Sequence, residues 1–295
     1  MKVNQLKAGV ALSYISMGLG YIISIIYTPI MLRLLGQSEY GLYNLVASVV
    51  SYLGLLSFGF GSAYMRYYSR FKVQNDQDNI AKLNGMFLII FSVIGFIAVL
   101  AGVALVFNVN YIFGEKLTVD ELSTAKILMV ILVINIAISF PTSIFQLHII
   151  ANEEYIFQNV LQMLKTIVNP FLALPVLLMG CKSIGLVSVT TVITIIIGIG
   201  NVVFCFKKLK IKFNFRQFDI SLLKEMTIFS SYIFMNMIID QVNWNVDKFI
   251  VGRYRGTAAV AVYSLAAQLN MYYLSLSTAI SNVFIPRVNR MVART

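Results

Sequence analysis

The sequence predicts an all-α membrane protein, a polytopic helical bundle of about eight transmembrane helices. Of its 295 residues, 59% are hydrophobic and 12% are charged, and the mean hydropathy is +0.81. A soluble domain cannot bury that much apolar surface. The apolar residues also form long, uninterrupted runs, whereas a membrane β-barrel would show short segments of alternating hydrophobicity.

Each apolar run can cross a hydrocarbon core about 30 Å thick, which takes roughly 20 residues of helix. The predicted spans are 8–32, 42–64, 84–107, 124–149, 156–179, 184–206, 226–251 and 258–285. The first six would form one lobe, residues 1–215, that ends in a basic cytoplasmic loop. The last two would begin a second lobe, residues 216–295. The loops are too short to hold a soluble domain.

Positive charge is distributed unevenly between the two ends of the predicted spans. The net charge of +11 would suggest nucleic-acid binding in a soluble protein, but in membrane proteins lysine and arginine collect in cytoplasmic loops. Fifteen of these residues fall on one side and five on the other, which places both termini in the cytoplasm. Lysines alternate with apolar residues in the basic loop at 207–224, which we expect to lie on the inner leaflet.

Residues typical of metal and catalytic sites are scarce. Cys181 and Cys205 lie beside or within apolar runs, and His148 has no ligand residue at a suitable spacing. The string Asp-Gln-Asp at 76–78 matches the DxD motif of metal-dependent glycosyltransferases, but it lies in a short loop without a nucleotide-binding domain. We therefore predict no catalytic residue and no metal.

Polar side chains recur along one face of the seventh span. Asn236, Asp240, Asn243 and Asp247 lie at i, i+4, i+7 and i+11, so a helix places all four on one stripe, with Trp244 beside it. A carboxylate inside a membrane usually faces the bundle interior or a wet cavity. We expect this helix to form one wall of a polar cavity. Trp244 could stack on a sugar ring or serve only in packing.

The fifth span has the same spacing in Gln158, Gln162, Lys165 and Asn169. Lys165 would lie about 15 Å deep, given a rise of 1.5 Å per residue. A buried ammonium needs a partner, so Lys165 would bind an anionic substrate, extend to the interface, or form an ion pair with Asp240. On the first span, Tyr21 would line the opposite wall or contribute to helix packing.

A motif around the outer loop of the first helix pair recurs 220 residues later. Arg33, Gly36, Tyr43, Leu45 and Ala47 are matched by Arg253, Gly256, Tyr263, Leu265 and Ala267. Six helices separate the copies, so both would have the same orientation, as in parallel repeats related by an axis along the membrane normal. Chance similarity between apolar helices is the alternative, but an arginine and a glycine matched in the turn favour a repeat.

Two short motifs resemble a known family. Leu35-Gly36-x-x-x-Tyr40-Gly41-x-Tyr43, and Asp247-Lys248-x-x-x-Gly252 followed by Gly256 and Tyr263, are similar to the polysaccharide biosynthesis flippases. These belong to the exporter superfamily that includes the multidrug and toxin (MATE) antiporters. The resemblance implies two six-helix lobes around a central cavity. Since the family has twelve or fourteen helices, we expect the chain to be a fragment with the first lobe and the start of the second.

The resemblance implies a function as well as a fold. It implies that undecaprenyl-pyrophosphate-linked oligosaccharide is moved across a bacterial inner membrane by alternating access, with Lys165 holding the phosphates. Asp240, or less directly Asp247, would bind H⁺ or Na⁺ and couple export to an ion gradient; no other cofactor is expected. The partners would be the lipid-linked substrate, membrane lipids, and polysaccharide polymerase and glycosyltransferases, without nucleic acid.

Three other functions stay open at this point. A MATE-like antiporter for small cations would favour acidic residues in the first lobe, and the first six predicted spans contain none. A membrane-embedded glycosyltransferase or acyltransferase would depend on the acidic pair at 76 and 78. A non-catalytic scaffold in polysaccharide assembly is the third.

Overall fold

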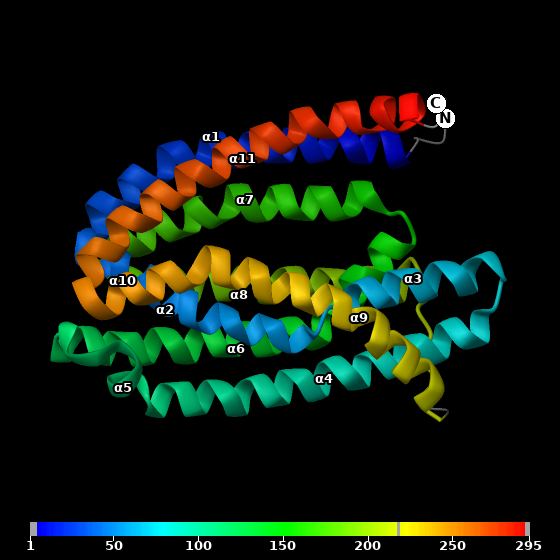
Figure 1. Cartoon of the computed structure of the whole chain (residues 1–295), viewed down its shortest axis with the longest axis horizontal. Coiled ribbons are helices and arrows are strands. Elements are labelled where there is room, and N and C mark those ends of the chain that lie inside the picture. The colour runs from blue at the N-terminus through cyan, green and yellow to red at the C-terminus, as the bar shows by residue number, and fades with distance from the viewer. Residues whose placement is uncertain (1–4, 217–218, 293–295) are drawn as a thin grey trace.

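The computed structural model describes residues 5–216 and 219–292, except for the side chains of residues 6, 7, 115 and 276–292. All regular structure in this part of the chain is helical, as predicted (Figure 1). The elements are α1 (Gln5–Leu35), α2 (Gln37–Ser51), η1 (Tyr52–Ser57), α3 (Phe60–Val73), α4 (Gln77–Phe107), α5 (Val109–Phe113), η2 (Gly114–Lys116), α6 (Val119–Ala151), α7 (Tyr155–Leu178), α8 (Lys182–Lys207), α9 (Ile220–Gln241), η3 (Val242–Val246), α10 (Asp247–Arg255) and α11 (Thr257–Val292).

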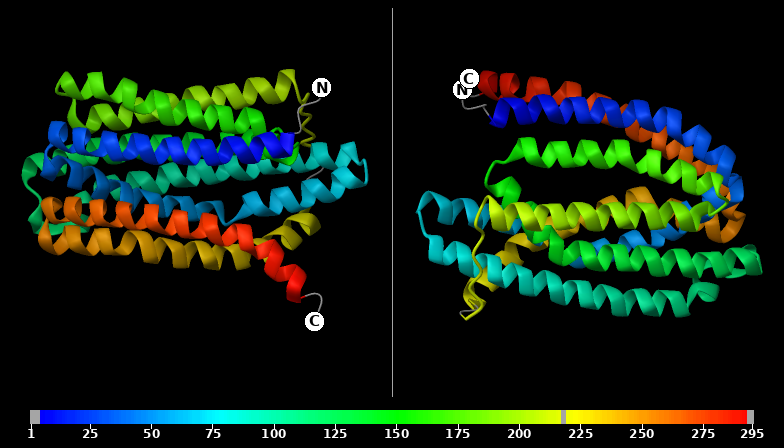
Figure 2. Two further views of the ribbon diagram at one scale, coloured as in Figure 1. Left: turned by 90° about the horizontal axis from the view of Figure 1, so that it is seen from above. Right: turned by 180° about the vertical axis from the view of Figure 1, so that it is seen from behind.

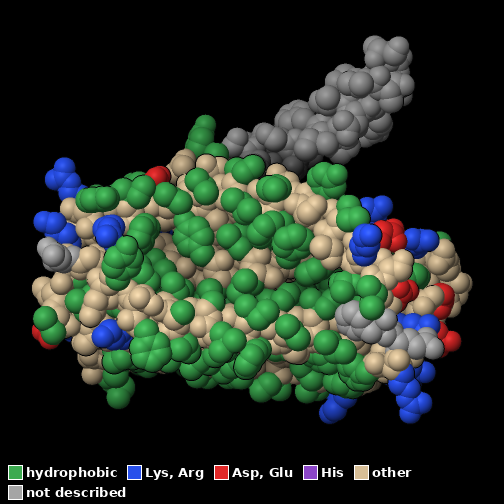
Figure 3. Space-filling model, turned by 60° about the horizontal axis from the view of Figure 1, so that its bottom comes forward, with side chains coloured by type: hydrophobic (Ala, Val, Ile, Leu, Met, Phe, Trp, Pro, Cys, Tyr) green, Lys and Arg blue, Asp and Glu red, His purple; other side chains and the backbone are tan. Residues whose placement is uncertain are grey.

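Seven helical segments within the described residues are long and apolar enough to cross a membrane. They correspond to the first seven predicted spans. The eighth predicted span lies in α11, and its side chains from residue 276 onward are outside the described part. On the face drawn in Figure 3, apolar side chains cover the middle, whereas lysine, arginine, aspartate and glutamate gather toward the two ends. This distribution fits a multi-pass membrane protein.

The long helices run side by side in one bundle (Figures 1 and 2). α6 packs between α4 and α8, α1 pairs with α7, and α11 pairs with α2. α1 begins and α11 ends at the same end of the bundle, which we call the N-terminal end. At the opposite end, here called the far end, Gly36 joins α1 to α2 and Gly256 joins α10 to α11.

Two of the predicted spans are interrupted helices. Between α2 and α3 the chain passes through the 3₁₀ turn η1 and then Phe58 and Gly59, which have φ of 51° and 70°. Residues other than glycine rarely adopt this left-handed backbone conformation. A Cβ at Gly59 would also overlap Ile233 of α9. Between α9 and α10 the helix widens into the π turn η3. Such turns are frequent at functional sites.

The segment that follows α8 corrects one prediction from the sequence. Ile211 is buried, and Leu209 and Phe213 pack against the same apolar core, so these three side chains do not face the inner leaflet as expected; Phe215 is exposed. The Asn214 N–H donates to the Ala81 carbonyl at 2.9 Å. The expectation was wrong because alternation in an extended segment shows that one face is apolar, not whether that face meets lipid or protein.

Candidate functional site

The two copies of the repeated motif share one backbone geometry. Gly36 has φ 82° and ψ 161°, and Gly256 has φ 80° and ψ 179°. This region of conformational space is essentially restricted to glycine. Each glycine separates the end of one helix from the start of the next, so the repeat seen in the sequence is also a repeat in the structure.

Equivalent residues of the two copies contact one another reciprocally at the far end. Gln37 Nε2 donates to the Ala258 carbonyl at 3.1 Å, and Ser38 Oγ lies 3.0 Å from Thr257 Oγ1. An offset of 220 makes Gln37 equivalent to Thr257 and Ser38 equivalent to Ala258. The two contacts therefore exchange under the offset, as they would about an approximate two-fold axis. That axis runs between α2 and α11.

The same reciprocity holds deeper in the bundle. The rings of Tyr21 on α1 and Tyr272 on α11 lie 5.1 Å apart between centroids. Gln241, the equivalent of Tyr21, donates through Nε2 to the Ser51 carbonyl on α2 at 3.2 Å. Ser51 precedes Tyr52, which is the equivalent of Tyr272. Each copy thus meets the other at the same depth.

A cavity of about 580 Å³ lies on this axis. Ser24 and Thr28 of α1 line it from one copy, and their equivalents Trp244 and Lys248 line it from the other. α2, α7, α8 and α11 complete the walls. Lys248 is the one charged side chain among the described residues that line the cavity, and its ammonium makes no ion pair within the described chain.

Two buried hydroxyls of the cavity wall have no hydrogen-bond partner in the described chain. They are the hydroxyls of Tyr27 and Ser264, and Ser264 is only 5% exposed. Buried polar groups are nearly always hydrogen-bonded to protein, water or ligand. With the Lys248 ammonium and the amide of Asn44 also in the wall, the cavity suits an occupant that carries both negative charge and hydroxyl groups.

Several residues predicted from the sequence line this cavity. Trp244 and Asn169 do so, and so do the motif residues Tyr43 and Lys248. Asn169 accepts a hydrogen bond from Thr190 at 3.3 Å, so its amide is held across the α7–α8 seam. Tyr21 lies beside the cavity in its contact with α11.

The acidic stripe of the seventh span lies elsewhere. Asp240, Asn243 and Asp247 are exposed, and none of them lines the cavity. Asp247 accepts a hydrogen bond from Tyr263 at 2.6 Å. It forms no ion pair with an arginine, because Arg253 donates to backbone carbonyls of α5 at 2.7 and 2.8 Å.

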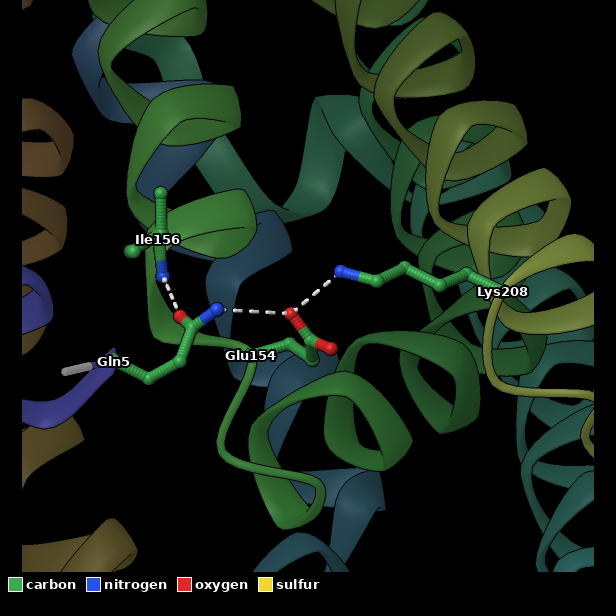
Figure 4. Close-up of polar contacts among 4 residues, drawn as sticks. All are labelled: Gln5, Glu154, Ile156 and Lys208. Carbon is green, nitrogen blue, oxygen red and sulfur yellow. Dashed lines mark hydrogen bonds and ion pairs between the residues drawn. The ribbon is translucent and has the colours of Figure 1, made fainter. Parts of the chain in front are cut away.

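The suggested ion pair between Lys165 and Asp240 is wrong. Lys165 is half-buried on α7, one turn from Asn169, and Gln162 is exposed on the same helix. The ion pair found among the described residues is a different one, between Lys208 and Glu154 at 2.9 Å (Figure 4). The physical reason is topological: α7 packs mainly on α1 and α8, whereas Asp240 projects from the exposed face of α9.

The family motif residues have structural roles at the far end. Gly252 faces Leu45, and a Cβ there would overlap the leucine side chain. Gly36 and Gly256 form the two helix junctions described above. The sequence identified Lys248 only as a residue of the family motif. Lys248 is the equivalent of Thr28 under the repeat offset, and both line the cavity.

A second cavity of about 650 Å³ lies nearer the N-terminal end, beside the break between α2 and α3. Ser57, Ser62, Ser139 and Ser143 contribute hydroxyls to its wall, and Ile233 of α9 closes one side. No charged side chain is found among its described lining residues. It adjoins α9, as the first cavity adjoins η3 and α10.

Comparison with known proteins gives one family and one fold. Residues 6–292 match the family model described as "Polysaccharide biosynthesis protein". Two solved structures of a multidrug resistance MATE family transporter of the MOP superfamily, outward-facing and inward-facing, each align with a TM-score of 0.64, at 16% and 14% identity. They cover 92% and 90% of this chain and 62% and 61% of their own.

A MOP superfamily transporter from Pyrococcus furiosus, whose binding pocket is described as having reverse polarity, aligns with a TM-score of 0.61 at 15% identity. The alignment covers 90% of this chain and 60% of that one. At such low identity these likenesses show a shared MATE-like transporter fold. The chain spans about three fifths of the length of these transporters. Comparison with curated proteins gave no match.

Proposed function

The chain belongs to the polysaccharide biosynthesis protein family, and we propose that it moves a lipid-linked oligosaccharide across a membrane by alternating access. Family and fold both support membrane translocation. The finer proposal is that the carrier is undecaprenyl pyrophosphate, that the membrane is a bacterial inner membrane, and that the N-terminal end of the bundle faces the cytoplasm. Since the chain covers about three fifths of its structural relatives, the proposal concerns the whole protein.

The observation that carries this proposal is the unpaired Lys248 in the cavity between the repeats. A half-buried cation without a partner favours an anionic occupant, because each phosphate oxygen can accept a charge-assisted hydrogen bond. The same charge would repel an organic cation, which is the substrate expected of a MATE-like antiporter. Lys165, one turn from Asn169, would meet the phosphates at another stage of transport.

The rest of the cavity wall suits a sugar. Trp244 offers an aromatic face, and sugars pack their apolar ring faces on aromatic side chains. The hydroxyls of Tyr27 and Ser264 and the amides of Asn44 and Asn169 would bind sugar hydroxyls. These groups come from both repeats, so relative motion of the repeats would change how the occupant is held.

Contacts at the far end support a state closed on that side. Thr257 at the start of α11 donates to Glu121 of α6 at 2.7 Å and contacts Ser38 of α2. No ion pair between these helices is found in the described chain, so opening would break neutral or singly charged hydrogen bonds, each contributing about 0.5–3 kcal/mol. Asp240 remains our candidate for H⁺ or Na⁺ coupling, and membrane lipids and the enzymes of glycan assembly remain proposed partners.

Glycan export by the full-length protein in a deletion strain tests the proposal. Lys248→Gln should lower export by about tenfold or more at equal expression, because a charged hydrogen bond to a phosphate is lost. Lys207→Gln, at the end of α8 and outside both cavities, is the matched control and should export normally. Normal export by Lys248→Gln, or resistance to organic cations as the only phenotype, would reject the proposal.

A further inference from the structure

A small pocket of about 160 Å³ lies at the N-terminal end of the bundle. α3, α4, α6 and the segment after α8 contribute its walls. It shares no lining residue with the cavity between the repeats. Its volume has room for one tetrahedral oxyanion with some water and is too small for a sugar nucleotide.

The floor of this pocket is polar and deeply buried. Asn84 is 1% exposed and His148 is 4% exposed. Tyr64 Oη bonds both of them, 2.7 Å from Asn84 Oδ1 and 2.9 Å from His148 Nδ1. The Asn84 amide nitrogen donates to the Lys212 carbonyl at 3.0 Å, which identifies its oxygen as the acceptor of the Tyr64 proton.

This chain of bonds determines what His148 can offer to a ligand. Because the Tyr64 proton goes to Asn84, Tyr64 Oη must accept from His148, so Nδ1 carries the ring proton. Nε2 of the neutral ring is then an acceptor, and it has no partner among the described residues. The pocket floor therefore suits a ligand that has a hydroxyl to donate.

The walls above this floor are cationic. Lys72, Lys210 and Lys212 line the pocket, and no aspartate or glutamate is among its described lining residues. The Lys72 ammonium donates to the Ala151 carbonyl at 3.2 Å and to Asn152 Oδ1 at 3.3 Å, which leaves one of its three donors free. The ammonium groups of Lys210 and Lys212 make no ion pair within the described chain.

The neighbouring Lys208, in contrast, has a carboxylate partner. Its ammonium pairs with Glu154, which also accepts from Gln5 at 3.4 Å, and Gln5 in turn accepts from the Ile156 N–H (Figure 4). The three pocket lysines have no such carboxylate. Their side chains are exposed, and all three would attract an anion bound in the pocket.

We propose that this pocket binds a singly protonated phosphate group, with the lysines holding its anionic oxygens and its one P–OH donating to His148 Nε2. The source is either free hydrogen phosphate or the monoester headgroup of a lipid. General enrichment of lysine near the membrane surface would explain charge at this end of the bundle. It would not explain three lysines around a concave site with a buried polar floor.

A bound anion would also act on the connection between the repeats. Lys210 and Lys212 belong to the segment that leads from α8 to α9, and Lys210 has φ of 52°, which is uncommon for a residue with a side chain. The same segment is held on α4 through Asn214 and Ala81. Phosphate in the pocket would fasten this connector to the first six helices.

The first test is thermal unfolding of the purified full-length protein with added inorganic phosphate or sulfate. Phosphate should raise Tm more than sulfate, because sulfate has the same shape but no hydroxyl at neutral pH. Lys210→Gln with Lys212→Gln should weaken phosphate binding by about tenfold or more, since two charged hydrogen bonds are lost. Lys210→Arg with Lys212→Arg should retain it.

Lys207→Gln with Lys224→Gln is the matched control, because it removes the same charge outside the pocket. Equal weakening in both pairs, or no effect of phosphate on the wild-type protein, would overturn the proposal. Native mass spectrometry with phosphatidic acid or phosphatidylglycerol identifies the source: selective retention of the monoester lipid indicates a lipid, and a response to inorganic phosphate alone indicates the free ion. Lys248→Gln should leave all of these responses intact, so the two proposals fail separately.

Discussion

Gly41 of α2 lies directly against the backbone carbonyl of Thr257 at the start of α11, so closely that a Cβ on residue 41 would overlap it. The residues come from the two copies of the repeat, and α2 and α11 form one of the most extensive helix pairs in the bundle. Backbones that approach this closely need a small residue at the contact, as is common between membrane helices. The position therefore decides how tightly the two copies meet at the far end.

Gly41→Ala should separate α2 from α11. Overpacking a close contact costs about 1–3 kcal/mol, and the hydrogen bonds of Gln37 and Ser38 to α11 should weaken with it. Thermal unfolding of the purified protein measures the loss. Gly18→Ala on α1 is the control, because nothing lies within 4 Å of a Cβ there; equal effects of the two changes would show that Gly41 has no special role.

Gly36→Ala and Gly256→Ala should also destabilise the protein, both for the same reason, which differs from that for Gly41→Ala. A Cβ at Gly36 meets no atom within 4 Å, and one at Gly256 meets only the Lys116 carbonyl at 3.9 Å, so space is not limiting. The cost comes from the backbone, since φ near 80° with an extended ψ costs side-chain-bearing residues about 1–3 kcal/mol.

The two variants should lose similar stability, because the two junctions have the same geometry. Denaturation midpoints of both, measured beside Gly18→Ala, check this. A loss at only one junction would indicate that the copies are not structurally equivalent.

The crossing helices could be predicted from the sequence because apolar length is a direct consequence of bilayer thickness. The repeat was also visible, because Gly36 and Gly256 occupy turns that only glycine can form. Neither helix break was predicted. Phe58 and Gly59 adopt left-handed conformations inside an apolar run, and η3 adds a π turn without any proline to mark it.

The site was only partly predictable, because helical spacing shows which residues share a face and not what that face meets. The stripe of Asp240 and Asp247 does share a face, but it is exposed, and Lys248 beside it lines the cavity. The spacing of Lys165 on the fifth span likewise did not show which helix its side chain would meet. Which distant helices pack together depends on tertiary packing, and it could not be read from the periodicity of a single sequence.

Ser264→Ala should reduce transport without reducing stability. The Ser264 hydroxyl is buried and has no protein partner, so its removal leaves no donor or acceptor newly unsatisfied in the protein. An occupant that used this hydroxyl would lose about 1 kcal/mol of binding, or roughly fivefold in affinity. Glycan export at limiting expression and Tm are the two measurements.

Ser231→Ala on α9 is the matched control for this change, because the Ser231 hydroxyl bonds only a carbonyl of its own helix. Both variants should unfold at the wild-type temperature. If Ser264→Ala raised Tm and exported normally, the hydroxyl would belong to the packing and not to a binding surface.

A disulfide between positions 38 and 257 should lock the far end. Ser38 Oγ and Thr257 Oγ1 lie 3.0 Å apart, so cysteines at these positions would bring their sulfur atoms within bonding reach after small side-chain rotations. We expect Ser38→Cys with Thr257→Cys, made in a Cys181→Ser background because Cys181 is exposed, to cross-link on oxidation. Under alternating access the oxidised protein should not export glycan, and a reductant should restore export.

The single cysteine variants are the controls. Efficient cross-linking without loss of export would mean that the substrate does not pass between α2 and α11, and the transport path would have to be placed elsewhere in the bundle.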